Sequence, residues 1–256
     1  MKILVNFGAG CILESGNALC FLADILGHIF KGRIRLAEVL KQVYEQGIQS
    51  VAIVALTSLA SGAVLALQGY AAMGRFGAKE YVAHLVALSL VRELGPVFTA
   101  LIFSGKAGAR ITAELGTMNV NDQVLATRTM GVDPVEYLVV PRMVACFLAL
   151  PILTIISEIV GIAGGYCVGV WEAKIPGIFY LNQTIRAVQY VDFFSGFTKV
   201  FFFAVIIGWV SCYQGFFTKG GSLGVGRFTT KAVAYSYIFI ILSNAVLTKV
   251  ILTFWG

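Results

Sequence analysis

The chain has 256 residues, of which 58% are hydrophobic and only 12% carry a charge. Soluble domains carry roughly twice that charged fraction, so this composition excludes a soluble globular protein and indicates an integral membrane protein. The formal net charge is +6. Because no basic stripe or RNA-binding motif accompanies this charge, we expect no nucleic acid among the partners.

Residues 1–46 predict amphipathic helices that lie in the membrane interface. Apolar residues recur at helical spacing from Leu22 to Phe30 and again from Leu36 to Tyr44, with the basic stretch KGRIR between the two sets. Neither set is apolar on all sides, so we expect neither helix to cross the membrane. A small soluble subdomain is the alternative. The opening MKILVNFGAGCILESG has no cleavage site before a polar start, so we expect it to be retained.

Residues 47–256 predict an all-α domain of five transmembrane helices. Each apolar run has 24 to 29 residues, enough to cross a ~30 Å hydrocarbon layer at ~1.5 Å per residue. The predicted spans are residues 47–73, 81–105, 143–171, 193–217 and 232–255.

The distribution of basic residues predicts the orientation of these spans. Lys and Arg are frequent in the N-terminal segment and in the connections 106–142 and 218–231, and they are fewer in the other connections. The basic side of a membrane protein faces the cytoplasm. We therefore predict a cytoplasmic N-terminus, a cytoplasmic 106–142 connection and a C-terminus on the outer side.

The 106–142 connection is long for a turn between two spans, which indicates a role in docking. Its stretches TAELGTM and NDQVLATRTM predict short helices, and GVDP predicts a break before the third span. A passive surface loop is the alternative. We expect no cofactor in this chain, because SGKAG lacks the spacing of a phosphate-binding loop and GGSLGVG follows a span instead of a strand. If the protein uses ATP, another chain must bind it.

No catalytic or metal site is predicted. The five cysteines form no CxxC motif, and the two histidines are far apart and have no ligand-like neighbours. A cysteine in an apolar segment is usually a small buried hydrophobic residue.

Two full charges interrupt the second predicted span, in the stretch LVRELGP from Leu90 to Pro96. A charge at this depth is costly if it faces lipid, so Arg92 and Glu93 each need a partner or water. Neighbours in a helix point about 100° apart and do not pair with each other. Arg92 is expected to pair with Glu158 or to reach towards the interface, and Glu93 to face a watery cavity. An ion pair that only locks helices together is the alternative.

A long stretch around these charges resembles the MlaE permease family, the membrane subunits of ABC transporters that work with MCE proteins. The stretch is LVRELGPVFTALIFSGKAGARITAELGTMNVNDQVLATRTMGVDPVEYLVVPR, and the likeness continues through GGYCVGV, SCYQGFFTKGGSLGVGRFTTKAV and AVLTKVIL. It covers about residues 60–256. One departure is Asn244, where the family commonly has an aspartate.

The resemblance implies a homodimer of permeases, two cytoplasmic ABC ATPase subunits, an MCE-domain substrate-binding protein and lipid, usually phospholipid, as cargo. It implies that the 106–142 connection contains the coupling helix that docks on the ATPase, and that the glutamate of LVRELGP lies at a lipid cavity near the dimer interface. We assign substrate binding to Glu93, Leu94, Leu90, Met73, Phe76 and Arg92. We assign ATPase coupling to Glu114, Leu115, Met118, Asn121 and Gln123.

Two other functions remain open from the residues alone. An ion- or proton-coupled secondary carrier would use Arg92, Glu93 and Glu158 as a relay, although no internal repeat of the kind common in carriers is visible. A membrane scaffold without transport is the other alternative. The expected location is the bacterial inner membrane, with the plastid inner envelope as the alternative.

Overall fold

The computed structural model describes residues 2–30 and 35–255, and it describes the side chains of residues 16–30 and 35–253. All regular structure in these ranges is helical. Five helices are long and apolar enough to cross a membrane, which confirms the predicted architecture. They are Leu36–Gly74, Lys79–Val120, Val135–Trp171, Tyr190–Phe216 and Gly221–Thr253.

The spanning helices are longer than the apolar runs because they continue into polar segments. The first combines α2 (Leu36–Val43) and α3 (Gln49–Gly74). The second combines α4 (Val82–Ser89), α5 (Gly95–Phe103) and α6 (Ala109–Val120), joined by π-helical turns at Leu90–Leu94 and Ser104–Gly108. The third is α8 (Val140–Trp171), the fourth is α10 (Tyr190–Phe216) and the fifth is α11 (Gly221–Trp255).

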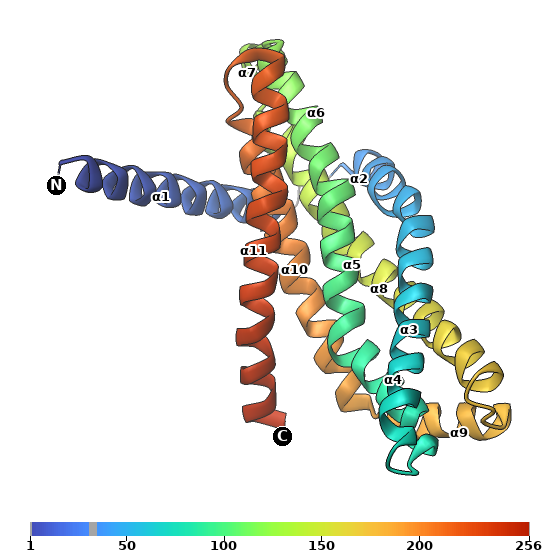
Figure 1. Ribbon diagram of the computed structural model, residues 1–256. Coiled ribbons are helices and arrows are strands. Elements are labelled where there is room, and N and C mark those ends of the chain that lie inside the picture. Colours follow the sequence, from blue (N-terminus) through green and yellow to red (C-terminus); the bar gives the residue numbers. More distant parts are fainter. Residues whose placement is uncertain (1, 31–34, 256) are drawn as a thin grey trace.

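Two short helices mark the opposite ends of the bundle. Helix α7 (Gln123–Thr129) lies at one end, and α9 (Gly177–Ala187) lies at the other end with the C-terminus (Figure 1). Of the two helices predicted in the 106–142 connection, the second is α7. The first is part of α6, which extends the second span without a break.

The N-terminal segment forms α1 (Lys2–Phe30), which runs crosswise to the spanning helices and projects from the bundle (Figure 1). The basic turn predicted at KGRIR falls largely on residues 31–34, which lie outside the described residues. Helix α2 continues into α3 through a π-helical turn at Tyr44–Ile48, so the first spanning helix begins at Leu36. The only glycine of that turn, Gly47, packs against Ala149 of α8 instead of ending the helix.

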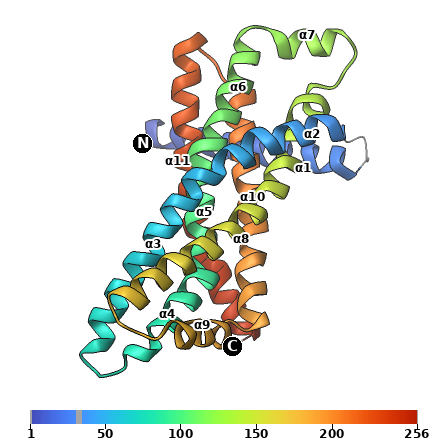
Figure 2. The same cartoon turned by 90° about the vertical axis from the view of Figure 1, so that its right-hand side faces the viewer.

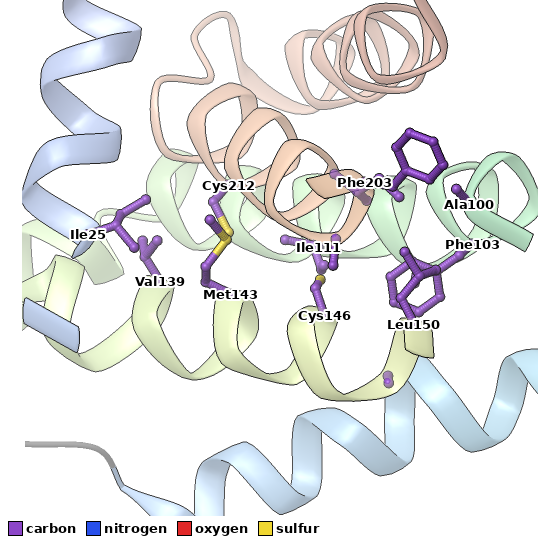
Figure 3. Close-up of a cluster of buried hydrophobic side chains, with 14 of the residues drawn as sticks. Ile25, Ala100, Phe103, Ile111, Val139, Met143, Cys146, Leu150, Phe203 and Cys212 are labelled. Carbon is purple, nitrogen blue, oxygen red and sulfur yellow. The ribbon is translucent and has the colours of Figure 1, made fainter. Parts of the chain in front are cut away.

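The main core lies where α5, α6, α8 and α10 meet (Figure 3). Phe103, Ile111, Leu150 and Phe203 are at most 1% exposed there. Helix α1 joins this core through Ile25, which is fully buried. Because lipid is as apolar as these side chains, dispersion contacts and close packing, more than exclusion from water, hold such helices together.

Helices α3 and α8 cross in close contact (Figure 2). A Cβ atom on Gly62 would overlap the carbonyl oxygen of Gly161, and one on Gly164 would overlap the carbonyl oxygen of Leu59. The hydroxyl groups of Ser58 and Ser157 also lie 2.6 Å apart across this contact. Small residues therefore allow the two backbones to touch, as is common between membrane helices.

We expect Gly62→Ala and Gly164→Ala to destabilise the protein, each by about 1–3 kcal/mol, because the added methyl group forces the two helices apart. The measurement is thermal unfolding of the purified protein in lipid nanodiscs. Gly226→Ala is the matched control, because no atom lies within 4 Å of the position where its Cβ would be. Equal melting temperatures for all three variants would contradict the glycine-dependent contact.

Candidate functional site

The charges of LVRELGP lie at a π-helical turn, Leu90–Leu94, between α4 and α5. Pro96 follows this turn and has no N–H, so it cannot donate the usual helical hydrogen bond to the carbonyl of Arg92. That carbonyl instead accepts a hydrogen bond from Lys199 Nζ of α10, at 3.1 Å. Gly196 permits the approach of α10, because a Cβ there would overlap the carbonyl oxygen of Val91.

Glu93 is the centre of a polar network that joins the second, fourth and fifth spans. Its Oε1 atom lies 2.5 Å from Lys199 Nζ and accepts a hydrogen bond of 3.0 Å from the hydroxyl of Thr248. Its Oε2 atom accepts a hydrogen bond of 3.1 Å from Asn244 Nδ2. The Lys199 side chain is only 1% exposed, whereas that of Glu93 is 35% exposed. Lys199 therefore depends on Glu93 for its counter-charge.

Arg92 pairs with Asp192 near the start of α10, and not with Glu158. Its Nε atom donates to Asp192 Oδ1 at 2.6 Å, and a second guanidinium nitrogen contacts the same oxygen. Glu158 of α8 is 7% exposed and packs against Gly95. The Arg92 side chain is 48% exposed and that of Asp192 is 4% exposed. The guanidinium of this pair is therefore accessible, whereas the carboxylate that binds it is buried.

These two pairs form one side of a cavity of about 280 Å³. Val191, Ile251 and Leu252 add apolar surface, so the cavity combines charged and apolar walls. It lies between the π-helical turn, the start of α10 and the end of α11, in the half of the bundle that holds α9 (Figure 1). Such a mixed lining suits an amphipathic ligand.

The structure brings together only part of the residues assigned to substrate binding. Arg92 and Glu93 line the cavity. Leu90 is 2% exposed inside a small apolar cluster, and Leu94 and Met73 pack against that cluster. Phe76 is 86% exposed in the turn after α3. A role of these four apolar residues in binding cargo stays a prediction.

Sequence reasoning did not assign to the site the four polar residues that bond to Arg92 and Glu93, namely Asp192, Lys199, Asn244 and Thr248. Lys199 could have been found, because it is the one charge within the predicted fourth span and an intramembrane cation requires an acid nearby. Asn244 was noticed only as a departure from the family pattern. Its amide donates to Glu93 where an ionised aspartate would place a second negative charge.

The residues assigned to coupling divide into two groups. Glu114 bonds to Arg110 at 2.7 Å and to Arg142 at 3.2 Å, and Leu115 is fully buried. Met118 packs against the main core. Asn121 and Gln123 are exposed at the start of α7, where Leu125 and Met130 are also exposed, by 57% and 74%. The accessible surface at this end is therefore α7 and its flanks.

Among the side chains that the structure describes, no group of three or more His, Cys, Asp or Glu residues is arranged to hold a metal ion. The described cysteines, Cys20, Cys146, Cys167 and Cys212, are free thiols.

Comparison with known proteins identifies the family. A family model described as Permease MlaE matches residues 39–250. A probable ABC transporter permease of Rickettsia typhi is 41% identical over 226 residues, which cover 88% of this chain and 87% of that protein.

Two further relatives come from other lineages. The intermembrane phospholipid transport system permease protein MlaE of Haemophilus influenzae is 37% identical over 211 residues, 82% of this chain and 81% of its own length. The chloroplastic protein TRIGALACTOSYLDIACYLGLYCEROL 1 of Arabidopsis thaliana is 35% identical over 226 residues, 88% of this chain and 65% of its own length. The matched residues include the Glu93 network and the 106–142 connection, and this chain belongs to the MlaE permease family.

Proposed function

We propose that this chain is the permease subunit of an ABC transporter that moves phospholipid between the inner membrane and an MCE substrate-binding assembly. ATP and Mg are bound by a separate ATPase subunit. The observation that carries the proposal is the cavity at Arg92 and Glu93, within a chain whose Haemophilus influenzae relative is a phospholipid transport permease.

The chemistry of the cavity supports a phospholipid as cargo. The guanidinium of Arg92 offers donors to a headgroup phosphate, and Val191, Ile251 and Leu252 offer apolar contact to the start of the acyl chains. The Glu93–Lys199 pair also lines the cavity and adds polar surface to it.

A second copy of the chain is proposed to complete this cavity. Helix α11 is poorly covered in the single chain, since only 11% of its most apolar stretch of 18 residues is buried. Its outward side chains include Ile241, Leu242 and Val246, each more than half exposed. A two-fold interface presents the same patch twice, so pairing along this side would place two Glu93 networks around one central space.

The ATPase is proposed to dock at α7, with this end and the N-terminus in the cytoplasm. Helix α7 stands at the end of the second span, and its apolar Leu125 is exposed among polar neighbours. Helix α6 connects α7 to the Glu93 turn through one continuous spanning element, Lys79–Val120. Movement of a docked ATPase would therefore reach the cavity through the second span.

A proton- or ion-coupled carrier is less well supported by the geometry. Arg92 pairs with Asp192 and Glu93 pairs with Lys199. Neither pairs with Glu158, so the three residues do not form the expected relay. The two functions are separated by purification of the complex from membranes. An ABC transporter brings a stoichiometric ATPase and shows ATP-dependent transfer of labelled phospholipid, and a carrier shows neither.

We expect Glu93→Ala to destabilise the protein by about 3–5 kcal/mol, because it leaves the buried Lys199 ammonium without a counter-charge. Lys199→Met should cost less, because the partly exposed Glu93 keeps its bonds to Asn244 and Thr248. Thermal unfolding in nanodiscs measures both changes.

The double variant Glu93→Gln/Lys199→Met removes both charges together. We expect it to regain most of the stability lost in Glu93→Ala and still to assemble with the ATPase, but to transfer phospholipid at least about tenfold more slowly. Transport at the wild-type rate in the stable double variant would show that the pair only locks helices together.

For coupling, we expect Leu125→Asp on α7 to release the ATPase or to separate ATP hydrolysis from lipid transfer without lowering the melting temperature. Glu114→Lys should instead lower the melting temperature, because it opposes Arg110 and Arg142. Pull-down of the ATPase and its hydrolysis rate distinguish the two effects. Wild-type coupling in Leu125→Asp would remove α7 as the docking site.

A further inference from the structure

A second cavity lies at the other end of the bundle from the Glu93 site, among α1, the end of α10 and the start of α11 (Figure 1). Its volume is about 540 Å³, within the ~300–1,000 Å³ range of small-molecule sites. No residue lines both cavities. The transport proposal does not use this cavity.

One wall of the second cavity is aromatic. Phe21 of α1 is 5% exposed, and its ring centroid lies 5.6 Å from that of Phe217 and 5.8 Å from that of Tyr213. Phe228 and Tyr235 of α11 also line the cavity. Helix α1 is held in place here by a hydrogen bond of 2.8 Å from Trp209 Nε1 to the carbonyl of Ala18. A specific contact therefore fixes the part of α1 that contributes to this wall.

The cavity also carries a net positive charge. Among the lining residues that the structure describes, Lys219 in the connection between α10 and α11 and Lys231 on α11 are the cations, and Asp24 of α1 is the acid. Neither lysine forms an ion pair with a carboxylate that the structure describes. Lys231 Nζ lies 5.4 Å from the centroid of the Phe228 ring. Within the described part of the chain, both ammonium groups therefore lack a counter-charge and can attract an anion.

The position of the cavity favours a lipid over a soluble anion. It lies where α10 ends and α11 begins, on the side that the distribution of Lys and Arg predicts to be cytoplasmic. Aromatic rings and basic residues at this depth match the interfacial zone of a bilayer, and basic pockets between helices on this side bind anionic lipid headgroups. A soluble phosphate would use the lysines but not the aromatic wall.

We propose that this second cavity binds one anionic phospholipid of the cytoplasmic leaflet. The lipid phosphate lies between the ammonium groups of Lys219 and Lys231, and the acyl chains lie along the aromatic side of α1 and α11. Asp24 weakens the attraction for a negative headgroup. The bound lipid joins α1 to the ends of α10 and α11, and it is separate from the transported cargo.

Native mass spectrometry of the full-length permease complex, released from nanodiscs of phosphatidylglycerol and phosphatidylethanolamine, tests the site. In Lys219→Gln/Lys231→Gln we expect retained phosphatidylglycerol to fall about tenfold, since each lysine near the surface contributes a several-fold preference for anionic lipid. Arg227→Gln is the matched control, because Arg227 is an exposed cation one turn before Lys231 that does not line the cavity.

Asp24→Asn is a second variant, for which we expect the retention of phosphatidylglycerol to rise. A misfolded protein would not retain more lipid, so this result cannot be caused by a loss of folding. Unchanged retention in the double lysine variant, an equal loss in Arg227→Gln, or no rise in Asp24→Asn overturns the proposal. Displacement of the lipid by millimolar inorganic phosphate would show a site for free phosphate, and it also overturns the proposal. None of these readouts depends on transport, so they remain informative if the transport proposal fails.

Discussion

The buried ammonium of Lys199 constrains the structure around the Glu93 cavity. It lies in an apolar spanning helix, is 1% exposed, and bonds to Glu93 and to the carbonyl of Arg92. An unpaired charge at such a position would cost several kcal/mol. The second and fourth spans must therefore stay in register at this level, and Thr248 and Asn244 bring the fifth span into the same arrangement. A polar requirement thus fixes the relative positions of three otherwise apolar helices.

Backbone features make this arrangement possible. The missing N–H of Pro96 leaves a carbonyl that Lys199 uses, and Gly196 lets α10 approach the turn. Glycines have the same effect between α3 and α8, where the absence of a side chain lets the two backbones touch. Hydrophobic burial contributes little inside a membrane. Close approach and a few hydrogen bonds therefore carry much of the specificity of this fold.

The sequence was sufficient to predict the five spans and the family. Long apolar runs are a strong signal of spans, and several long motifs in the same order as in the family are a strong signal of kinship. It also located Glu93 as an intramembrane charge that needs a partner. It did not identify Asp192 or Lys199 as partners, since they are about a hundred residues away along the chain and only the packing of α10 brings them near. The sequence also did not show that Leu90 is buried. The helical spacing of apolar residues does not reveal that this face of the second span packs against α3 and α8. Helix ends were also misjudged, because α2 and α6 extend the first and second spanning helices beyond the apolar runs, and the glycines at these junctions do not break the helix.

Asp192 serves two neighbours with its two oxygens. Oδ1 receives the Arg92 guanidinium, and Oδ2 accepts a hydrogen bond of 2.9 Å from the backbone N–H of Gln189, which caps the start of α10. The ion pair of Arg92 at the cavity wall consequently depends on the first turn of α10 being intact. Any force that unwinds that turn, such as a pull on the short link from α9, also withdraws the acid from Arg92 and leaves a half-exposed cation facing the cavity.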